Sequence, residues 1–138
     1  MSLYPLQIVT PDGLLYDGEV TKVRVRTIEG DVGIMARHAD FTTALGMGIA
    51  YINIDETACR HAACIGGLLV VINGKARIVA TTFEWADEID IKRAHLAREK
   101  AEEMIASDVA TEDKKVAQSR LRRALIRIRA FEKEKAGE

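Results

Sequence analysis

The sequence contains few of the residues that cross-link or break a chain, and no long apolar run. Its 138 residues include two cysteines and two prolines. No stretch approaches the roughly 18 consecutive apolar residues that a membrane helix needs. The first residues also lack the charged and apolar regions of a secretion signal. We therefore expect neither a membrane span nor a disulfide scaffold, and we expect a cytoplasmic protein.

The two cysteines are poorly placed for joint chemistry. Cys59 and Cys64 are five residues apart within a predicted strand, and the alternation of side chains along a strand directs them to opposite faces. We expect two free thiols, and not a disulfide, a zinc site or a redox pair.

Motifs of catalysis are also missing from the sequence. It contains no His-x-x-x-His, no Gly-x-Ser-x-Gly and no glycine-rich phosphate loop. Of its three histidines, His38 lies in a predicted loop, where we interpret it as a hydrogen-bonded structural residue and not as a general base. The sequence therefore favours a binding protein over an enzyme.

The N-terminal part reads as an all-β domain. Short β-branched runs alternate with turn signals, which is typical of a sandwich or barrel. Residues 23–26 alternate apolar and charged side chains, and residues 29–33 are interpreted as a break. Asn73 and Gly74 separate two apolar runs and predict a tight hairpin. We predict this domain over residues 1–86. Further strands are expected at residues 6–9, 49–54, 65–72 and 78–80.

Residues 87–138 predict an antiparallel helical hairpin. The segment has no proline and no glycine before Gly137, and good helix formers dominate it. Asp90 and Thr111 are candidate N-caps. Because each apolar seam is narrow, burying it yields only a few kcal/mol at about 25 cal/mol per Å², so we expect a hairpin that can open. The seams are Ala94, Ala97, Ala101 and Met104 on the first helix, and Ala117, Leu121, Ala124, Ile128 and Phe131 on the second.

The net charge of −1 conceals two oppositely charged segments. Residues 88–113 carry four basic and eight acidic side chains, whereas residues 114–138 carry nine basic and three acidic ones. Within the second segment, five arginines lie along two faces of the helix, a pattern that fits either a solvated basic face or an anionic partner. Nucleic acid is the weaker candidate partner, because an acidic segment lies in the same chain. These residues are Arg120, Arg123 and Arg127 on one face, and Arg122 and Arg129 on another.

Three segments in this order resemble the epsilon subunit of bacterial F-type ATP synthase. Residues 28–34, with His38 after them, resemble the family's Glu-Gly-x-x-Gly-Ile segment, and residues 65–71 resemble its Gly-Gly strand. Ile89-Asp90-x-x-Arg93-Ala94 is similar to the nucleotide-binding motif of some members. Ala36 and Asp40 stand where the family usually has proline, so the loop between them can differ in shape.

The resemblance implies a non-catalytic rotor subunit at the cytoplasmic face of the bacterial cell membrane. Its fold is a ten-strand β sandwich followed by a two-helix hairpin. The sandwich binds the gamma subunit and the c-ring loops, and the hairpin folds back or extends toward the catalytic α and β subunits, where it restrains ATP hydrolysis. The rotor-interface residues implied are Glu29, Gly30, Gly33 and His38, and the inhibitory contacts are Arg120, Arg122, Arg123, Arg127 and Arg129.

ATP is implied as a regulatory ligand of the folded hairpin, whereas no metal or required cofactor is implied. Guanidinium groups suit phosphate oxygens, and a carboxylate suits the base or ribose. The matching positions are Glu84, Ile89, Asp90, Arg93, Ala94, Arg123 and Arg127.

Two other functions compete with this reading. Lys75 directly follows the Asn73-Gly74 turn, as the modified lysine does at the hairpin tip of a lipoyl or biotinyl carrier domain. The sequence lacks the flanking acidic and methionine residues of such a carrier, and a carrier does not explain the helical segment. The basic helix is also compatible with a nucleic-acid-binding arm, which salt-sensitive DNA binding would reveal.

Overall fold

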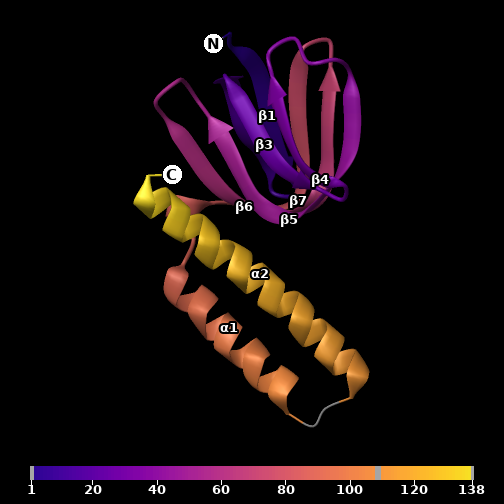
Figure 1. The fold of residues 1–138 in the computed structure, drawn as a ribbon, viewed down its shortest axis with the longest axis vertical. Coiled ribbons are helices and arrows are strands. Elements are labelled where there is room, and N and C mark those ends of the chain that lie inside the picture. The colour runs from indigo at the N-terminus through magenta and orange to yellow at the C-terminus, as the bar shows by residue number, and fades with distance from the viewer. Residues whose placement is uncertain (1, 108–109, 138) are drawn as a thin grey trace.

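The computed structural model describes residues 2–107 and 110–137, and within them no helix is long and apolar enough to cross a membrane. Seven strands come first, followed by a short 3-10 helix and two α-helices (Figure 1). Their bounds are β1 Tyr4–Thr10, β2 Gly13–Val20, β3 Lys22–Thr27, β4 Gly30–Met35, β5 Phe41–Asn53, β6 Cys59–Ile72, β7 Lys75–Trp85, η1 Ala86–Glu88, α1 Ile91–Ala106 and α2 Thr111–Ala136.

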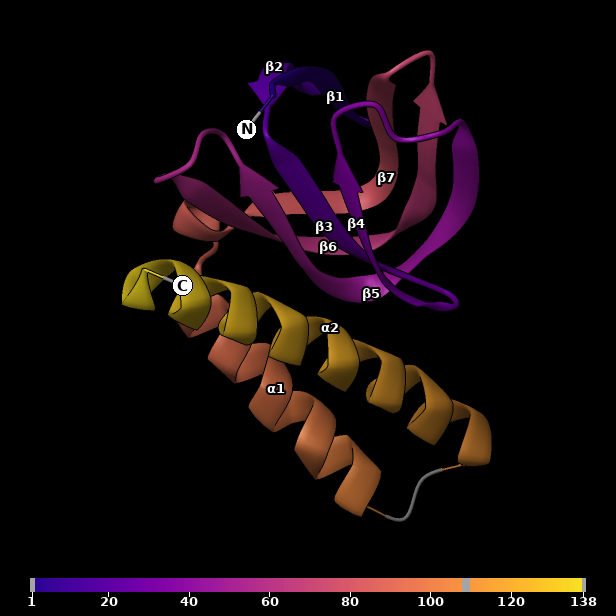
Figure 2. The ribbon, with the colours of Figure 1, turned by 45° about the horizontal axis from the view of Figure 1, so that its top comes forward.

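The strands form one hydrogen-bonded sheet in the order β2-β1-β7-β6-β5-β3-β4, which folds over on itself as a sandwich (Figure 2). β1 pairs with β7 in parallel, and the other neighbours are antiparallel. The fold class is as predicted, but the described residues contain seven strands and not ten. The difference arises because β5, β6 and β7, with 13, 14 and 11 residues, continue through the bend instead of being interrupted at it.

Glycines allow the long strands to bend. Gly66 and Gly67 of β6 have φ angles of +73° and +117°, which residues with a Cβ rarely adopt. A Cβ on Gly67 would also lie 2.0 Å from the carbonyl oxygen of Val79 on β7. The two strands therefore approach too closely for any other residue at this position.

The main core lies entirely within the sandwich. Its buried members run from Tyr4 to Trp85, and Leu6, Ile8 and Leu69 are fully enclosed. The predicted hairpin turn at Asn73 and Gly74 is confirmed, because both have positive φ angles and join β6 to β7. The predicted break at residues 29–33 is wrong beyond the turn itself, since residues 30–35 form β4 and pair with β3.

The helical hairpin was predicted better on α2 than on α1. Ala117, Ala124 and Ile128 are buried, and Leu121 and Phe131 are half-buried, as the seven-residue pattern indicated. On α1 the seam is displaced: Ala94 and Ala101 are buried, but Ala97 and Met104 are exposed. Ala97 and Met104 nevertheless line a cavity between α1 and α2, and Arg98 and Ile105 are half-buried.

The two predicted helix caps differ in outcome. The side chain of Asp90 accepts a hydrogen bond from the N–H of Arg93, which confirms it as the N-cap of α1. The prediction for Thr111 is wrong, since this residue is the first of α2, and the capping residue Ala110 makes no side-chain cap.

The C-terminal half of α2 lies against the sandwich, while α1 packs on α2 (Figures 1 and 2). Ala130 of α2 contacts a small cluster formed by Ala63 of β6, Ala86 of η1 and Ile89. This cluster has few members, with Ile49 and Ile126 packed at its edge, so it buries little apolar area compared with the main core. The division into a sandwich and a hairpin that fold separately stays a prediction.

Candidate functional site

A cavity of about 460 Å³ lies where the sandwich, α1 and α2 meet. β7 contributes Glu84 and α2 contributes Arg127, and the remaining residues come from the segment that joins β7 to α1 and from α1 itself. The lining residues are Glu84, Glu88, Ile89, Asp90, Arg93, Ala94, Ala97 and Arg127.

The path of the chain out of the sandwich positions one wall of this cavity. β7 ends at the buried Trp85, and the 3-10 turn η1 follows. Ile89 is then buried in the small cluster at the junction, which anchors the chain just before the helix. Asp90 caps α1 through the 3.1 Å hydrogen bond from the N–H of Arg93. The first turn of α1 is therefore fixed relative to β7, and it holds Arg93 and Ala94 at the cavity.

The opposite wall is fixed by an ion pair between the two parts of the molecule. Nε and Nη2 of Arg127 each lie 2.8 Å from Oε1 of Glu84. The two side chains are 29% and 37% exposed, so the pair is partly shielded from water. Charge-assisted contacts of this geometry are among the stronger hydrogen bonds in proteins. In this conformation Arg127 is already neutralised by a carboxylate of the chain itself.

A second cavity, of about 540 Å³, adjoins the first along the hairpin and shares Ala97 and Arg127 with it. Four cationic side chains line it, with apolar groups of the helix seam between them. The lining residues are Ala97, Lys100, Ala101, Met104, Ala117, Arg120, Arg123 and Arg127.

The structure brings together six of the seven residues predicted to bind ATP. Arg123 is the exception, because it lines the second cavity and not the first. Sequence reasoning missed Glu88 and Lys100. The spacing could have indicated Lys100, which follows Arg93 by seven residues and so lies on the same face of α1.

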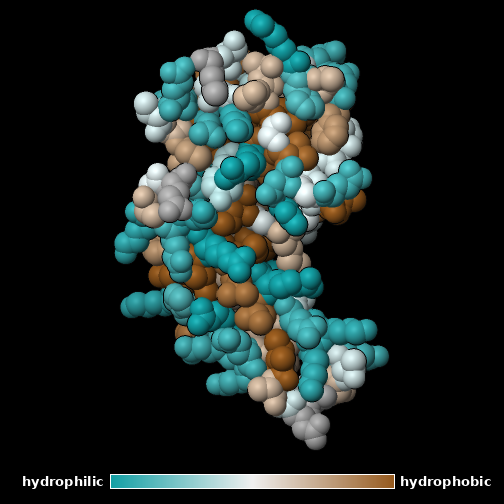
Figure 3. Space-filling model, in the orientation of Figure 1, coloured by the Kyte–Doolittle hydropathy of each residue, from teal (hydrophilic) through white to brown (hydrophobic). Residues whose placement is uncertain are grey.

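The arginines predicted to contact catalytic subunits differ in how accessible they are. Arg120, Arg122, Arg123 and Arg129 are exposed, whereas Arg127 is held by Glu84. Apolar side chains are also exposed on the hairpin, with Leu96 at 65% and Val116 at 49%. Figure 3 shows apolar groups in brown running along the helices between teal hydrophilic ones.

The residues predicted for the rotor interface are spread along β4 and the segments at its two ends. Glu29 and Gly30 lie at the turn between β3 and β4, whereas His38 lies at the far end of β4, in the loop before β5. Nδ1 of His38 is 2.7 Å from the carbonyl oxygen of Ala39, and its ring packs edge-on against Phe41. These contacts agree with the structural role expected for His38.

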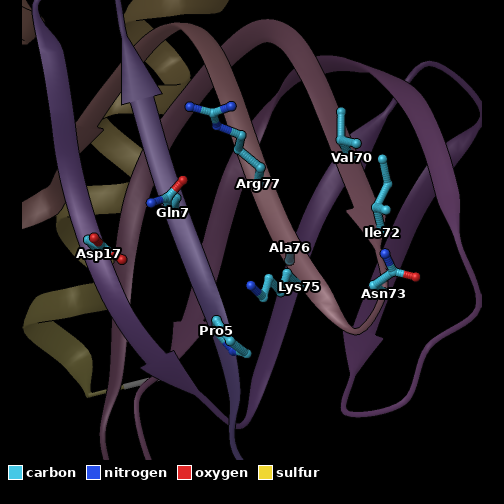
Figure 4. Close-up of a pocket in the computed structure, with 9 residues that line it drawn as sticks. All are labelled: Pro5, Gln7, Asp17, Val70, Ile72, Asn73, Lys75, Ala76 and Arg77. Atoms are coloured by element: carbon cyan, nitrogen blue, oxygen red, sulfur yellow. The ribbon is translucent and has the colours of Figure 1, made fainter.

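Lys75 belongs to a cavity of about 560 Å³ on the outer face of the sandwich (Figure 4). It pairs with Ile72 as the first residue of β7, next to the turn at residues 73–74. The cavity is lined by Pro5, Gln7, Asp17, Val70, Ile72, Asn73, Lys75, Ala76 and Arg77, and it is remote from the junction of the two parts.

Family models match both parts of the chain. Residues 3–86 match the model described as ATP synthase, Delta/Epsilon chain, beta-sandwich domain, and residues 87–132 match the model described as ATP synthase, Delta/Epsilon chain, long alpha-helix domain. The chain belongs to the ATP synthase delta/epsilon chain family. The fold class and the family resemblance read from the sequence are thereby confirmed, and the carrier-domain alternative is set aside.

Relatives in this family match along nearly the whole chain. The ATP synthase epsilon chain of Caldicellulosiruptor bescii is 36% identical over 135 residues, covering 98% of each chain, and that of Syntrophomonas wolfei is 37% identical over 134 residues, covering 96% of each. The sodium-ion-specific epsilon chain of Acetobacterium woodii is 33% identical over 105 residues, covering 76% of this chain and 79% of the relative.

Solved structures show the same fold at lower identity. A chain of the Euglena gracilis mitochondrial ATP synthase, in a structure of OSCP, F1 and the c-ring, has a TM-score of 0.70 at 22% identity, covering 99% of this chain and 81% of its own. A chain of the central stalk and c-ring of the Tetrahymena thermophila enzyme has a TM-score of 0.62 at 16% identity, covering 92% and 95%. Family membership makes this chain a non-catalytic stalk subunit of ATP synthase.

Proposed function

We propose that this chain links the gamma subunit to the c-ring in the bacterial ATP synthase rotor and so helps to couple ion translocation to ATP synthesis. Full-length similarity to epsilon chains supports this role. A rotor contact must persist through every rotational state, and the sandwich, with its continuous core, is the rigid part of the molecule that can maintain it. In this role the protein is peripheral to the cytoplasmic face of the membrane.

The helical hairpin acts as a regulatory arm that restrains ATP hydrolysis when it extends toward the catalytic α and β subunits. Two features support this. The arm meets the sandwich through a small cluster of alanines and isoleucines, so undocking it exposes less apolar surface than opening the main core would. It also carries four exposed arginines that can pair with acidic surfaces of a partner.

ATP acts as the ligand that holds the arm folded. The observation that carries this proposal is the cavity at the junction, where Glu84 of the sandwich, Arg93 of α1 and Arg127 of α2 converge. A ligand bound there contacts all three elements and is lost when they separate, so it stabilises the folded arm by mass action. Arg93 and Arg127 suit phosphate oxygens, and Asp90 and Glu84 suit the hydroxyl and amino groups of a nucleoside.

The deciding experiment is reconstitution of the synthase with the gamma subunit from the same source. Co-purification of this chain with gamma tests the rotor role. The rate of ATP hydrolysis with the full-length chain and with a chain that lacks the arm tests the inhibitory role.

A further inference from the structure

The C-terminal end of α2 contacts β6 at the point where the pairing of β6 with β7 ends. The pairing of β6 with β7 ends at Ala62 and Trp85, because the chain leaves the sheet there to form η1. The N–H of His61, one residue beyond, donates to Oε2 of Glu134 on α2 at 3.0 Å. A carboxylate of the helix thus occupies the position that a β7 carbonyl would otherwise fill.

The same carboxylate oxygen also accepts from the ring of His61. Nδ1 of His61 contacts Oε2 of Glu134, across 73 residues of sequence. Because a carboxylate can only accept, Nδ1 carries the proton in this contact. Nε2 is buried and has no hydrogen-bond partner within the described part of the chain. The ring therefore depends on Glu134 for its polar contact.

The surroundings of this pair are enclosed. His61 is 1% exposed, and its ring packs edge-on against Tyr51 of β5. The Arg24 guanidinium also lies on the Tyr51 ring, 3.8 Å from its centroid. Burial and the nearby Glu134 carboxylate together raise the pKa of the Cys59 thiol.

Glu134 follows Arg127 by seven residues and thus lies on the same face of α2. The partner of Arg127, Glu84, is paired in the sheet with Ala63, two residues from His61. The arm is consequently attached to the sheet at two polar points, and the alanine contact at Ala130 lies between them.

We propose that His61 and Glu134 form a latch that holds the C-terminal end of the arm on the sandwich without nucleotide. This inference rests on the proposed function in one respect, namely that the arm moves. If the phosphates of ATP replace Glu84 as the partner of Arg127, the His61–Glu134 contact is unaffected and still anchors the helix end. Undocking exposes the His61 N–H and imidazole to water and breaks both hydrogen bonds, so the latch adds to the stability of the folded arm.

The test measures docking directly in the isolated full-length chain without ATP. Spin labels are placed at A58C on the sandwich and K115C on α2, both exposed positions, in a background in which Cys59 and Cys64 are alanine. Pulsed electron paramagnetic resonance then measures the distances between the two labels, and their distribution gives the ratio of docked to released arms. We expect Glu134→Ala to lower that ratio about tenfold, since both hydrogen bonds to a charged group are lost, and His61→Leu to lower it less, since the main-chain N–H still donates to Glu134.

Two variants serve as controls. Glu132→Ala removes an exposed carboxylate from the same turn of α2 and is expected to change the ratio less than twofold. His61→Asn keeps a donor near the position of Nδ1 and is expected to retain most of the docking. Circular dichroism verifies that each variant retains its strands and helices.

The double variant His61→Leu with Glu134→Ala should be released no more than Glu134→Ala alone, because the two residues act through one contact. The latch is overturned if Glu134→Ala behaves like Glu132→Ala, or if the two effects add in full. The rate of ATP hydrolysis by the reconstituted synthase distinguishes failure of the latch from failure of the proposed function. Release in the isolated chain with no effect of arm deletion on hydrolysis leaves the latch standing and rejects only the inhibitory role.

Discussion

Arg127 of α2 and Glu84 of β7 are joined by two nitrogen atoms that share one carboxylate oxygen, each at 2.8 Å. In the proposed regulation Arg127 also binds a phosphate of ATP, so the ligand must compete with Glu84 for it. The ion pair therefore lowers the affinity for ATP while it stabilises the folded arm. Both effects depend on the same guanidinium group.

We expect ATP at millimolar concentration to raise the melting temperature of the full-length chain. A ligand at about 100 times its Kd that binds only the folded arm contributes about 2.7 kcal/mol. Arg127→Ala and Arg93→Ala should remove most of this increase. Arg98→Ala is the matched control, since Arg98 pairs with Glu102 on α1 and does not line the cavity. Calorimetry with and without ATP measures the shift, and an Arg127→Ala variant that responds like the parent contradicts the site.

Residues 1–86 should fold without the arm. Every buried member of the main core lies within this range, so removing the arm leaves the sandwich core intact and exposes the small cluster at the junction together with His61. Circular dichroism of the isolated segment should show a β-sheet spectrum with cooperative thermal unfolding. An unfolded segment would show that the arm is part of the folding unit, and Ala63 and Ala86 would then be essential contacts.

The features that sequence reasoning predicted correctly are local. The turn at Asn73 and Gly74 depends on two adjacent residues that tolerate positive φ, and the cap by Asp90 depends on an N–H three residues away. The contacts of Arg127 with Glu84 and of Glu134 with His61 join residues 43 and 73 positions apart. Such contacts depend on how α2 lies across the sheet, which helical periodicity alone does not determine.

The displaced seam of α1 has a related cause. Periodicity assigned Ala97 to the contact with α2, but Ala97 is exposed. Alanine is small, so leaving it at the exposed margin of a helix interface costs little stability. The next residue, Arg98, is half-buried, and its guanidinium group reaches Glu102 on the same helix. Sequence pattern identified the buried Ala94 and Ala101 but not which neighbour completes the contact.

Stability should fall at alkaline pH because of buried acidic groups. Burial raises the pKa of the Cys64 thiol from 9.0 to about 12, and burial likewise raises the pKa of the Tyr4 hydroxyl, which donates to the carbonyl oxygen of Ile34. The unfolded chain therefore loses these protons first. The stabilising contribution of Cys64 is present in full below pH 9 and is lost between pH 9 and about pH 12.

Urea unfolding at several pH values between 8 and 11 tests this expectation. One group contributes a slope of at most about 1.4 kcal/mol per pH unit. Cys64→Ala should be less stable at pH 8, because the core loses volume, but its stability should decline less steeply above pH 9. Parallel curves for the parent and the variant would show that Cys64 does not ionise on unfolding.

Removing the arm from residue 88 onward should leave a synthase that assembles and couples but hydrolyses ATP faster. Assembly depends on the sandwich, whose core is complete without the arm. Inhibition depends on the arm, whose residues 114–138 carry nine basic and three acidic side chains. A tenfold shift between folded and extended arms requires only about 1.4 kcal/mol, which a few charge contacts with acidic subunit surfaces can supply.

Replacing Arg122, Arg123 and Arg129 with alanine should reproduce part of the deletion, because these exposed side chains are free to meet a partner when the arm extends. Arg127→Ala is informative in a different way, since it also breaks the pair with Glu84 and favours release of the arm. High salt should weaken inhibition by the parent chain, because it screens the charges of these arginines. It should affect the triple variant less, because that variant lacks those charges. The hydrolysis rate is compared at matched occupancy of the full-length and shortened chains. Equal rates would reject the inhibitory role and leave only the rotor role of the sandwich.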